Sequence, residues 1–378
     1  MPSRQRPAGA SQTGIAPASP DTLFPLTPFA ADRFDALTRW VHAQFPGREP
    51  TFAPASADAS FRRYFRASFH DGKLPHIAPH IVMDAPPMQE DCRPFIRVAA
   101  LFGAAGVNVP AVIAQDLSQG FLLLSDMGDT TYLAALNANA TRADQLYRDA
   151  LGALIRIQSA SRPGTLPPYD RALLLREMQL LPEWYIAKHK NFALDDTQQN
   201  TVAQAFEILL VNNLAQPQVF VHRDYHSRNL MVWSHENADP ADPADNPGIL
   251  DFQDAVYGPI TYDLASLLKD AYIEWEEERI LDWAIRYWEA AKKSGLPVAH
   301  QFDDFYRDFE WIGLQRHLKV LGIFARLYHR DGKDGYLKHL PLVLRYTTKV
   351  CARYGVFAPL LRLLHVIENV KPQAGYTF

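Results

Sequence analysis

The sequence predicts an α+β fold in two parts, with a small β-rich N-terminal part followed by a larger helical C-terminal part. Two patterns support this prediction. Between about residues 30 and 130, short runs of β-forming residues alternate with turns. After Asp126, apolar residues recur at helical spacing in long segments separated by Pro and Gly. The 378 residues, 48% of them hydrophobic, suffice for one large core or two smaller ones. We therefore expect a tail over 1–30, an N-terminal lobe over 31–126 and a C-terminal lobe over 127–378.

The elements of the N-terminal lobe are predicted in a definite order. A first helix is expected over 32–45, where apolar residues follow helical periodicity. Candidate strands follow at 51–54, 62–69, 80–85, 110–116 and 120–126. Between the third and fourth strands, residues 90–106 are typical of a helix that ends at Gly106.

The C-terminal lobe is predicted to contain helices over 131–136, 143–160 and 170–190, with helical patterns returning from 262 to the end. Two strands are expected at 219–222 and 229–233, and a further short apolar run lies at 248–252. The segment 234–247 joins the last two, and its Pro and Asp content indicates an exposed hairpin connection.

Composition narrows the classes of partner and compartment. Lys and Arg total 38 against 42 Asp and Glu, a net charge of -4, so no basic field is expected to hold nucleic acid or an anionic membrane. Small molecules are the expected partners. Cys92 and Cys351 are too few for a disulfide framework and match neither a zinc nor a redox motif, which favours a reducing, cytoplasmic location. The opening segment is rich in Pro, Ala and Ser without an apolar centre, so we expect a disordered tail rather than a secretory signal.

The chemistry is indicated by three polar residues near short strands. Asp224 follows the strand at 219–222, Asn229 comes five residues later, and Asp251 ends the apolar run that follows. Phosphoryl transfer needs a base near the acceptor hydroxyl and metal ions to neutralise the phosphate oxygens. An Asp and an Asn on one loop, with a second Asp nearby, supply a base and the oxygen ligands that Mg²⁺ prefers. Each residue alone is more typical of a turn or a strand end, but the combination favours catalysis.

Two segments carry a family resemblance. HRDYHSRN (222–229) resembles the HGDxHxxN catalytic loop of aminoglycoside phosphotransferases and choline kinases, and LDFQDAVYGPITYDLASLL (250–268) resembles their metal-binding stretch. The resemblance implies a bilobal protein-kinase-like fold with ATP in its cleft. It also implies that Asp224 is the catalytic base, that Asn229 and Asp251 bind Mg²⁺, and that Asp263 orients the catalytic loop. For His226, internal packing or hydrogen bonding is favoured over proton transfer, because Asp224 already fills that role.

Further segments resemble one narrower group. They are SADASFRRYFRASF (56–69), IVMDAPPMQEDCRPF (81–95), GFLLLSDMGDTTYL (120–133) and GLQRHLKVLGIFARL (313–327). Together they are similar to the bacterial N-acetylmuramate/N-acetylglucosamine anomeric kinases of cell-wall recycling, which use ATP to make sugar 1-phosphates. The resemblance runs from about residue 35 to the C-terminus and implies an amino-sugar substrate.

The expected ATP site departs from the protein-kinase pattern. The loop at 56–63 lacks glycines, so backbone amides of Ser and Ala residues such as Ser60 would cover the phosphates. Met83 and Asp84 stand where a phosphate-pairing Lys is expected. The nearest replacements are Arg62 and Arg66 on one strand face and Arg63 on the other, with solvated edge charges as the alternative. Backbone groups of Ser125, Asp126 and Met127 are expected to meet adenine.

The sugar site is predicted from two helical segments. REMQLLPEWYIAKH (176–189) offers Glu183 and Trp184, with Glu177 and Tyr185 as further candidates, and 313–322 offers Gln315, Arg316, His317 and Lys319. Aromatic faces suit a sugar ring, and a carboxylate such as the lactyl group of N-acetylmuramate calls for Arg or Lys. The alternative is an amphipathic helix with a solvated face.

Two other functions stay open at this stage. A kinase of the same fold acting on an aminoglycoside or choline is one, and a nucleotide-binding pseudokinase, favoured by the missing Lys, is the other. No GxxxxGK[ST] motif is present, which argues against a P-loop kinase. The sequence specifies neither the oligomeric state nor a preference between the two amino sugars.

Overall fold

The computed structural model describes residues 28–57, 61–69, 77–233 and 247–370. Most of the expected tail, Ser60 and nearly all of the expected hairpin connection lie outside these ranges. The chain forms two compact units. One combines the described residues up to Glu90 with Ile113–Leu124, and the other combines Asp91–Val112 with the described residues from Ser125 onward.

The N-terminal unit is built on a five-stranded sheet in the order β1-β2-β3-β5-β4. Its strands are β1 (Pro50–Ala57), β2 (Arg63–Phe69), β3 (His80–Asp84), β4 (Val112–Asp116) and β5 (Phe121–Ser125). Strands β1, β2 and β3 are antiparallel neighbours. The five strands predicted from the sequence are all present, with ends shifted by a few residues.

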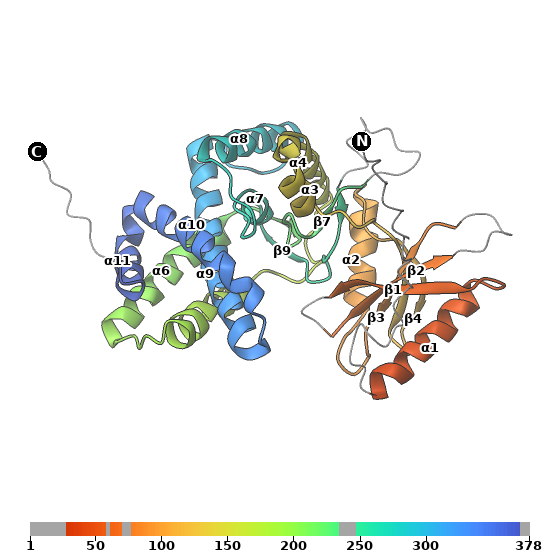
Figure 1. Ribbon diagram of the computed structural model, residues 1–378. Helices are drawn as coiled ribbons and strands as arrows, with labels where there is room; N and C mark the ends of the chain where they lie inside the picture. Colours follow the sequence, from red (N-terminus) through yellow and green to blue (C-terminus); the bar gives the residue numbers. More distant parts are fainter. Residues whose placement is uncertain (1–27, 58–60, 70–76, 234–246, 371–378) are drawn as a thin grey trace, which may run out of the picture. The chain divides into compact units, whose positions relative to one another are not determined.

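Helix α1 (Pro28–Gln44) covers one face of this sheet (Figure 1). Leu37 and Val41 on the helix are fully buried against alternate β2 residues, including Phe65 and Phe69. Alternation along a strand puts Arg63 on the same face as Phe65. The helix begins at Pro28, within the last three residues of the predicted tail.

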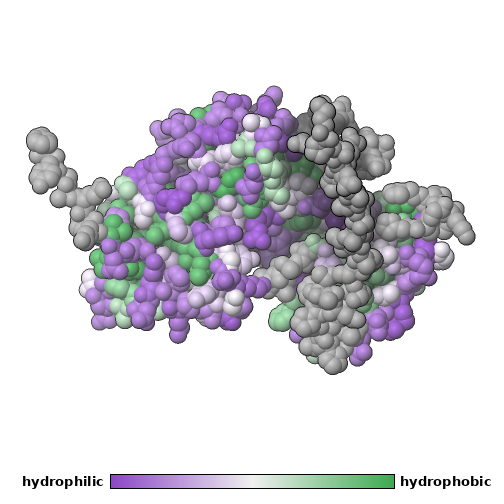
Figure 2. All heavy atoms as spheres, viewed as in Figure 1, coloured by the Kyte–Doolittle hydropathy of each residue, from purple (hydrophilic) through white to green (hydrophobic). Residues whose placement is uncertain are grey.

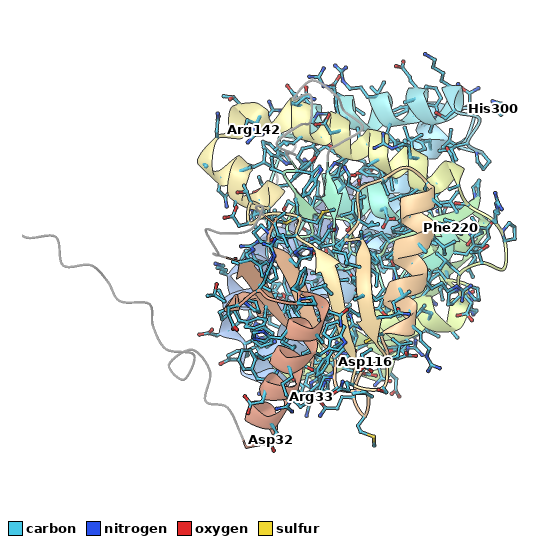
Figure 3. The ribbon with its side chains drawn as sticks, turned by 90° about the vertical axis from the view of Figure 1, so that its right-hand side faces the viewer. Asp32, Arg33, Asp116, Arg142, Phe220 and His300 are labelled. Atoms are coloured by element: carbon cyan, nitrogen blue, oxygen red, sulfur yellow. The ribbon has the colours of Figure 1, made fainter. Side chains whose placement is uncertain are left out.

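Asp84, at the end of β3, is fully buried and binds two guanidinium groups. Arg33 on α1 and Arg63 on β2 each donate to it through Nε at 3.0 Å. Arg33 also donates to the backbone oxygen of Gln119 at 2.7 Å, and Figure 3 shows it near Asp116 at the same end of this unit. A buried carboxylate needs paired partners of this kind. Asp84 therefore has a structural role, tying α1 to the sheet at the position where a Lys was expected.

The C-terminal unit is largely helical (Figure 1). Its α-helices are α2 (Arg93–Ala104), α3 (Tyr132–Ala138), α4 (Ala143–Ser159), α5 (Arg171–Met178), α6 (Asp196–Ala215), α7 (Tyr262–Leu268), α8 (Glu277–Lys293), α9 (Phe302–Asp331), α10 (Leu340–Arg353) and α11 (Ala358–Ile367). The short elements η2 (Ala140–Arg142), η5 (Asp334–His339) and η6 (Gly355–Phe357) are 3₁₀-helices, and η3 (Leu181–His189) is a π-helix.

Two short antiparallel pairs lie within this helical unit. β6 (Gln218–Val221) pairs with β9 (Val256–Pro259), and β7 (Leu230–Met231) pairs with β8 (Gly248–Ile249). Strand β9 was not predicted, and β7 and β8 are shorter than predicted. The chain leaves β8 early because Asp251 adopts a left-handed conformation with φ 63°, which ends the extended run.

Helix α9 lies at the centre of the C-terminal unit and is buried on all sides over Ile312–Leu321. Close packing against η3 requires Gly322, since a Cβ there would lie 2.3 Å from the backbone of Leu180. The predicted helix over 170–190 is divided at Gln179 into α5 and η3. Pro182 lacks an N–H at the start of η3, which favours irregular hydrogen bonding at this point.

The face of the C-terminal unit visible in Figure 2 is mostly hydrophilic, with smaller and separate hydrophobic areas. Within the described ranges, no single helix combines the length and apolar composition needed to cross a membrane. One pair of helical segments has the required length and apolar composition only when the two are counted together. They are Asp334–Arg353 and Gly355–Ile367, and the chain bends by 116° between them.

Candidate active site

The loop after β6 is held by the buried carboxylate of Asp263 at the start of α7. Asp263 accepts the backbone N–H of His222 at 2.6 Å and that of Arg223 at 3.0 Å. Arg223 lies in the left-handed region with φ 78°, a conformation that costs an L-residue on the order of 1–3 kcal/mol. Burial raises the pKa of Asp263 to about 7, against the lowering effect of the two N–H donors. The predicted role of Asp263 in orienting this loop is confirmed.

The ring of His222 holds the backbone of Asp224, two residues later. Its Nε2 lies 2.9 Å from the Leu250 oxygen, and its Nδ1 accepts the backbone N–H of Asp224 at 3.2 Å. The two partners select the tautomer protonated at Nε2. Burial lowers the pKa of His222 to about 4, so the ring is neutral at physiological pH. His222 therefore joins the loop at Asp224 to the segment that ends in Asp251.

Asp224 lies partly exposed in a cationic environment. Burial alone would raise the pKa of its carboxyl, but the nearby cations Lys319 and Arg316 bring the pKa below its usual value. The carboxylate is therefore ionised throughout the neutral range, as a general base must be. His226 is itself neutral there, since burial lowers its pKa, and its Nδ1 is buried without a hydrogen-bond partner among the described residues.

Asn229 and Asp251 lie side by side. The Asn229 side-chain nitrogen donates to Asp251 Oδ2 at 3.1 Å and to the backbone oxygen of Asp224 at 3.0 Å. Gln253 donates to Asp251 Oδ1 at 2.9 Å. Both amide protons of Asn229 are used in this way, which leaves its carbonyl oxygen for another electropositive partner. The structure thus brings together the three residues predicted to carry the chemistry.

The oxygen donors of Asn229 and Asp251 fit a hard cation such as Mg²⁺. Among the described residues, no group of three or more His, Cys, Asp or Glu side chains is arranged to hold a metal. Mg²⁺ is usually held by one or two protein ligands together with substrate phosphates and water. A site with so few protein ligands depends on the substrate to complete it.

Glu177 on α5 connects the loop to α9. Its Oε1 accepts Lys319 Nζ at 3.0 Å and also pairs with Arg223, while its other oxygen accepts the hydroxyl of Tyr169. Lys319 also donates to the hydroxyl of Tyr262 at 3.2 Å. Among the charged neighbours, Lys319 contributes most to the lowered pKa of Glu177, against the effect of burial. Glu177, predicted as a sugar ligand, is thus a buried partner of two cations near Asp224.

The candidates on α9 divide into two groups. Arg316 is buried like Lys319, and three-residue spacing puts the two on one helix face. His317 points elsewhere, because its Nε2 lies 3.0 Å from the Lys269 oxygen and its ring stacks on Tyr346 at 5.0 Å. Burial lowers the pKa of His317 to about 3, which is typical of a packed neutral ring.

The remaining sugar candidates lie on η3. Glu183 is exposed and Trp184 is half-buried, whereas Tyr185 is buried and donates to Glu368 at 2.8 Å. Gln315 on α9 is fully buried. Tyr185 and Gln315 are therefore parts of the packed interior.

The segment predicted to meet adenine follows β5. Ser125 Oγ accepts the backbone N–H of Ala111 at 2.8 Å, and Asp126 Oδ1 accepts that of Gly128 at 2.9 Å. Met127 is buried, and its side chain packs close to Gly248. The three residues thus form a well-packed connection.

The three arginines proposed for phosphate have different neighbours within the N-terminal unit. Arg63 pairs with Asp84 on the α1 side of the sheet. Arg62 forms an ion pair with Glu90 at 3.0 Å. Arg66, two residues after Tyr64 on β2, lies on the opposite strand face from Arg63.

Sequence reasoning missed one buried group at this site. Asp270 is fully buried, and its Oδ2 accepts both the backbone N–H of Ser227, at 3.0 Å, and the Ser227 hydroxyl. Asp270 therefore holds the later part of the loop, at Ser227, whereas Asp263 holds its beginning, at His222 and Arg223. An acidic residue within the mostly apolar run 264–271 is a signal that could have identified it.

Comparison with solved structures supports the fold. An ethanolamine kinase from Plasmodium vivax matches with a TM-score of 0.58 at 9% identity, covering 85% of this chain and 89% of the other. A choline/ethanolamine kinase family protein from Mesorhizobium loti matches with a TM-score of 0.56 at 13% identity, covering 88% and 99%. The predicted α+β, protein-kinase-like fold is confirmed.

Comparison with sequences identifies the family. Residues 51–302 match the family described as "Phosphotransferase enzyme family". A protein of Neisseria meningitidis named N-acetylmuramate/N-acetylglucosamine kinase is 48% identical over 345 residues, which is 90% of this chain and 98% of that protein. A protein of the same name from Pseudomonas aeruginosa is 46% identical over 342 residues, covering 88% and 96%. The chain therefore belongs to the phosphotransferase enzyme family.

Proposed function

We propose that this phosphotransferase is an ATP-dependent kinase that phosphorylates the anomeric hydroxyl of N-acetylmuramate and N-acetylglucosamine. The observation that carries the reaction is the proximity of Asp224, Asn229 and Asp251 on one hydrogen-bonded framework. The substrate class rests on the name shared by relatives that are 43–48% identical over about nine-tenths of the chain.

Asp224 is the proposed general base. Its lowered pKa keeps it ionised, so it accepts the hydroxyl proton as the sugar oxygen bonds to the γ-phosphorus of ATP and the bond from that phosphorus to the departing ADP breaks. An anomeric hydroxyl is more acidic than an ordinary sugar alcohol, which suits a weak carboxylate base. In a loose phosphoryl-transfer transition state, positioning contributes more than base strength. The neighbouring hydrogen bonds to His222 and Asp263 hold Asp224 in place for this role.

Asn229 and Asp251 are the proposed Mg²⁺ ligands. When bound there, Mg²⁺ would neutralise charge on the phosphate oxygens. The residues of the chain orient the ligand set: Asn229 is fixed by the Asp224 backbone, and Gln253 fixes Asp251.

For ATP we propose two groups of contacts. Backbone groups of Ser125 and Asp126, beside the buried Met127, are proposed for adenine. Ser60 and the arginines Arg62, Arg63 and Arg66 are the proposed phosphate contacts. Arg63 also pairs with Asp84, and Arg62 also pairs with Glu90, so a phosphate would share either cation with a carboxylate. A kinase that consumes ATP and acts on small sugars fits a cytoplasmic location.

For the sugar, we propose contacts from Glu183, Trp184, Arg316 and Lys319. Arg316 and Lys319 share the α9 face near Asp224, and Trp184 offers a half-exposed aromatic surface. We assign His317 a supporting role only, since its ring is engaged by Lys269 and Tyr346.

A panel assay tests the proposal. The protein is incubated with Mg²⁺, ATP and each of N-acetylmuramate, N-acetylglucosamine, choline and an aminoglycoside, and ADP release is followed. The two amino sugars should be turned over, and Asp224→Asn should lower turnover by orders of magnitude while ATP binding persists. Turnover of choline or the aminoglycoside alone would contradict the substrate assignment, and ATP binding without any turnover would favour a pseudokinase.

A further inference from the structure

Arg316 differs from the other cations near Asp224 in its partners. Lys319 and Arg223 both pair with the Glu177 carboxylate. Arg316 is only 3% exposed, and its Nη1 is buried without a hydrogen-bond partner in the part of the chain that the structure describes. Burying a guanidinium is costly unless an acceptor compensates for the lost water. The observation therefore points to an acceptor supplied by a ligand.

The position of Arg316 on α9 places it near the acceptor end of the reaction. Lys319 is one turn further along the helix, on the same face, and it is linked through Glu177 to Arg223, the residue before Asp224. Gly313, one turn earlier on this face, lies close to Ala265 on α7. The charge of Arg316 also acts on both Asp224 and His226. The guanidinium thus belongs to the surroundings of the proposed base.

The two proposed sugars differ in charge. N-acetylmuramate carries a lactyl carboxylate on the oxygen at C3, two ring carbons from the anomeric centre, and N-acetylglucosamine carries a neutral hydroxyl there. A carboxylate held close to Asp224 and Asp251 meets like charge, which disfavours binding unless a cation compensates. The neutral sugar meets no such repulsion.

On the basis of the proposed function, we infer that Arg316 binds the lactyl carboxylate of N-acetylmuramate and so determines how well this acidic sugar competes with N-acetylglucosamine. Guanidinium suits this role because its paired N–H donors match the two oxygens of a carboxylate. Lys319 is less suited, since Glu177 and Tyr262 already occupy two of its three N–H donors. Arg316 is therefore a specificity-determining residue for the acidic sugar.

The test compares kcat/KM for both sugars at pH 8 in Arg316→Gln, Arg316→Lys and wild type. Loss of a buried charged pair should lower kcat/KM for N-acetylmuramate on the order of 100-fold in Arg316→Gln and leave N-acetylglucosamine within about threefold. Arg316→Lys should retain part of the preference. Arg330→Gln, on the exposed face of the same helix, is the matched control and should change neither value.

Several outcomes separate the alternatives. Equal losses for both sugars would overturn the inference and assign Arg316 to the phosphoryl group or to Asp224. If Arg316→Gln does not fold, the decision comes from the substrate: wild-type kcat/KM should fall for the methyl ester of N-acetylmuramate, and less so in Arg316→Lys. Identical values for acid and ester would also overturn the inference. Failure of wild type to phosphorylate either sugar would instead refute the proposed function on which it rests.

Discussion

The side-chain nitrogen of Asn229 donates to Asp251 Oδ2 at 3.1 Å, so the two proposed metal ligands are already in contact in the folded chain. The same nitrogen holds the backbone oxygen of Asp224 at 3.0 Å. One amide thus connects the proposed base to the second ligand, although 22 residues separate Asn229 from Asp251. This connection makes the positions of the base and the metal ligands interdependent.

Asp251→Ala should abolish productive use of Mg·ATP, because the site loses its only proposed carboxylate ligand. We expect turnover to fall at least 100-fold at saturating sugar, with part of the loss recovered at higher Mg²⁺. Titration of activity against Mg²⁺ measures this. Gln253→Ala, which removes only the hydrogen bond to Asp251, should shift the Mg²⁺ dependence modestly. An Mg²⁺ titration of Asp251→Ala that matches wild type would exclude Asp251 as a ligand.

Lys319→Met should move the acid limb of the kcat/KM profile to higher pH. Lys319 is the leading attraction that lowers the pKa of Asp224 against burial, so its removal raises that pKa. Asp224 accepts a proton only in its ionised form, which exists above its pKa. As the pH is lowered, activity should therefore be lost at a higher pH in this variant than in wild type. Lys319→Arg retains the charge and serves as the control. An acid limb at the same pH in Lys319→Met would mean that Asp224 does not set it.

Substitution of the three arginines on and before β2 should separate nucleotide contacts from structural ones. Arg63→Gln leaves the fully buried Asp84 with one partner instead of two, so we expect a loss of stability on the order of 3 kcal/mol. Arg62→Gln and Arg66→Gln should raise KM for ATP with less effect on unfolding. Wild-type ATP kinetics in all three variants would place the phosphate cation elsewhere in the chain.

His317 should make the folded state sensitive to acid. Burial lowers its pKa to about 3, whereas an unfolded chain takes up the proton near the ordinary histidine value of about 6.5. The neutral, buried ring of His317 therefore contributes fully to stability above about pH 6.5, and this contribution is lost as the pH falls toward 3. Between pH 7 and 5 the free energy of unfolding should fall by about 2 kcal/mol from this group. Urea unfolding at both pH values should show a smaller loss in His317→Gln. The same loss in that variant would assign the acid sensitivity to other groups.

The sequence predicted the five strands of the N-terminal sheet and the helix at 93–104, because alternation, helical periodicity and Gly106 are local signals. It did not predict β9, whose four residues pair with β6 about 38 positions earlier. It also predicted one helix where α5 and η3 stand, since the division depends on packing against Gly322. Short strands and irregular helices of this kind are decided by tertiary contacts rather than by local propensity.

The candidate site also contains some residues that local sequence signals predicted and others that only tertiary contacts reveal. Asp224, Asn229 and Asp251 were predicted from their residue types and spacing, and Asp263 from the resemblance of its segment to a known family. The link from Glu177 to both Arg223 and Lys319 could not be predicted, since it joins positions 46 and 142 residues apart. The different surroundings of Arg316 and His317 could not be predicted either, because adjacent helical residues point in different directions and only the packed neighbours distinguish them.

The position of phosphoryl transfer tests the central claim most directly. Wild-type protein is incubated with ATP, Mg²⁺ and N-acetylmuramate, and the product is identified by ³¹P and ¹H NMR. We expect a sugar 1-phosphate, formed in equal amount with ADP while reducing-end reactivity disappears, and no turnover of the 1-deoxy sugar. A 6-phosphate product, or rapid turnover of the 1-deoxy sugar, would contradict transfer to the anomeric hydroxyl.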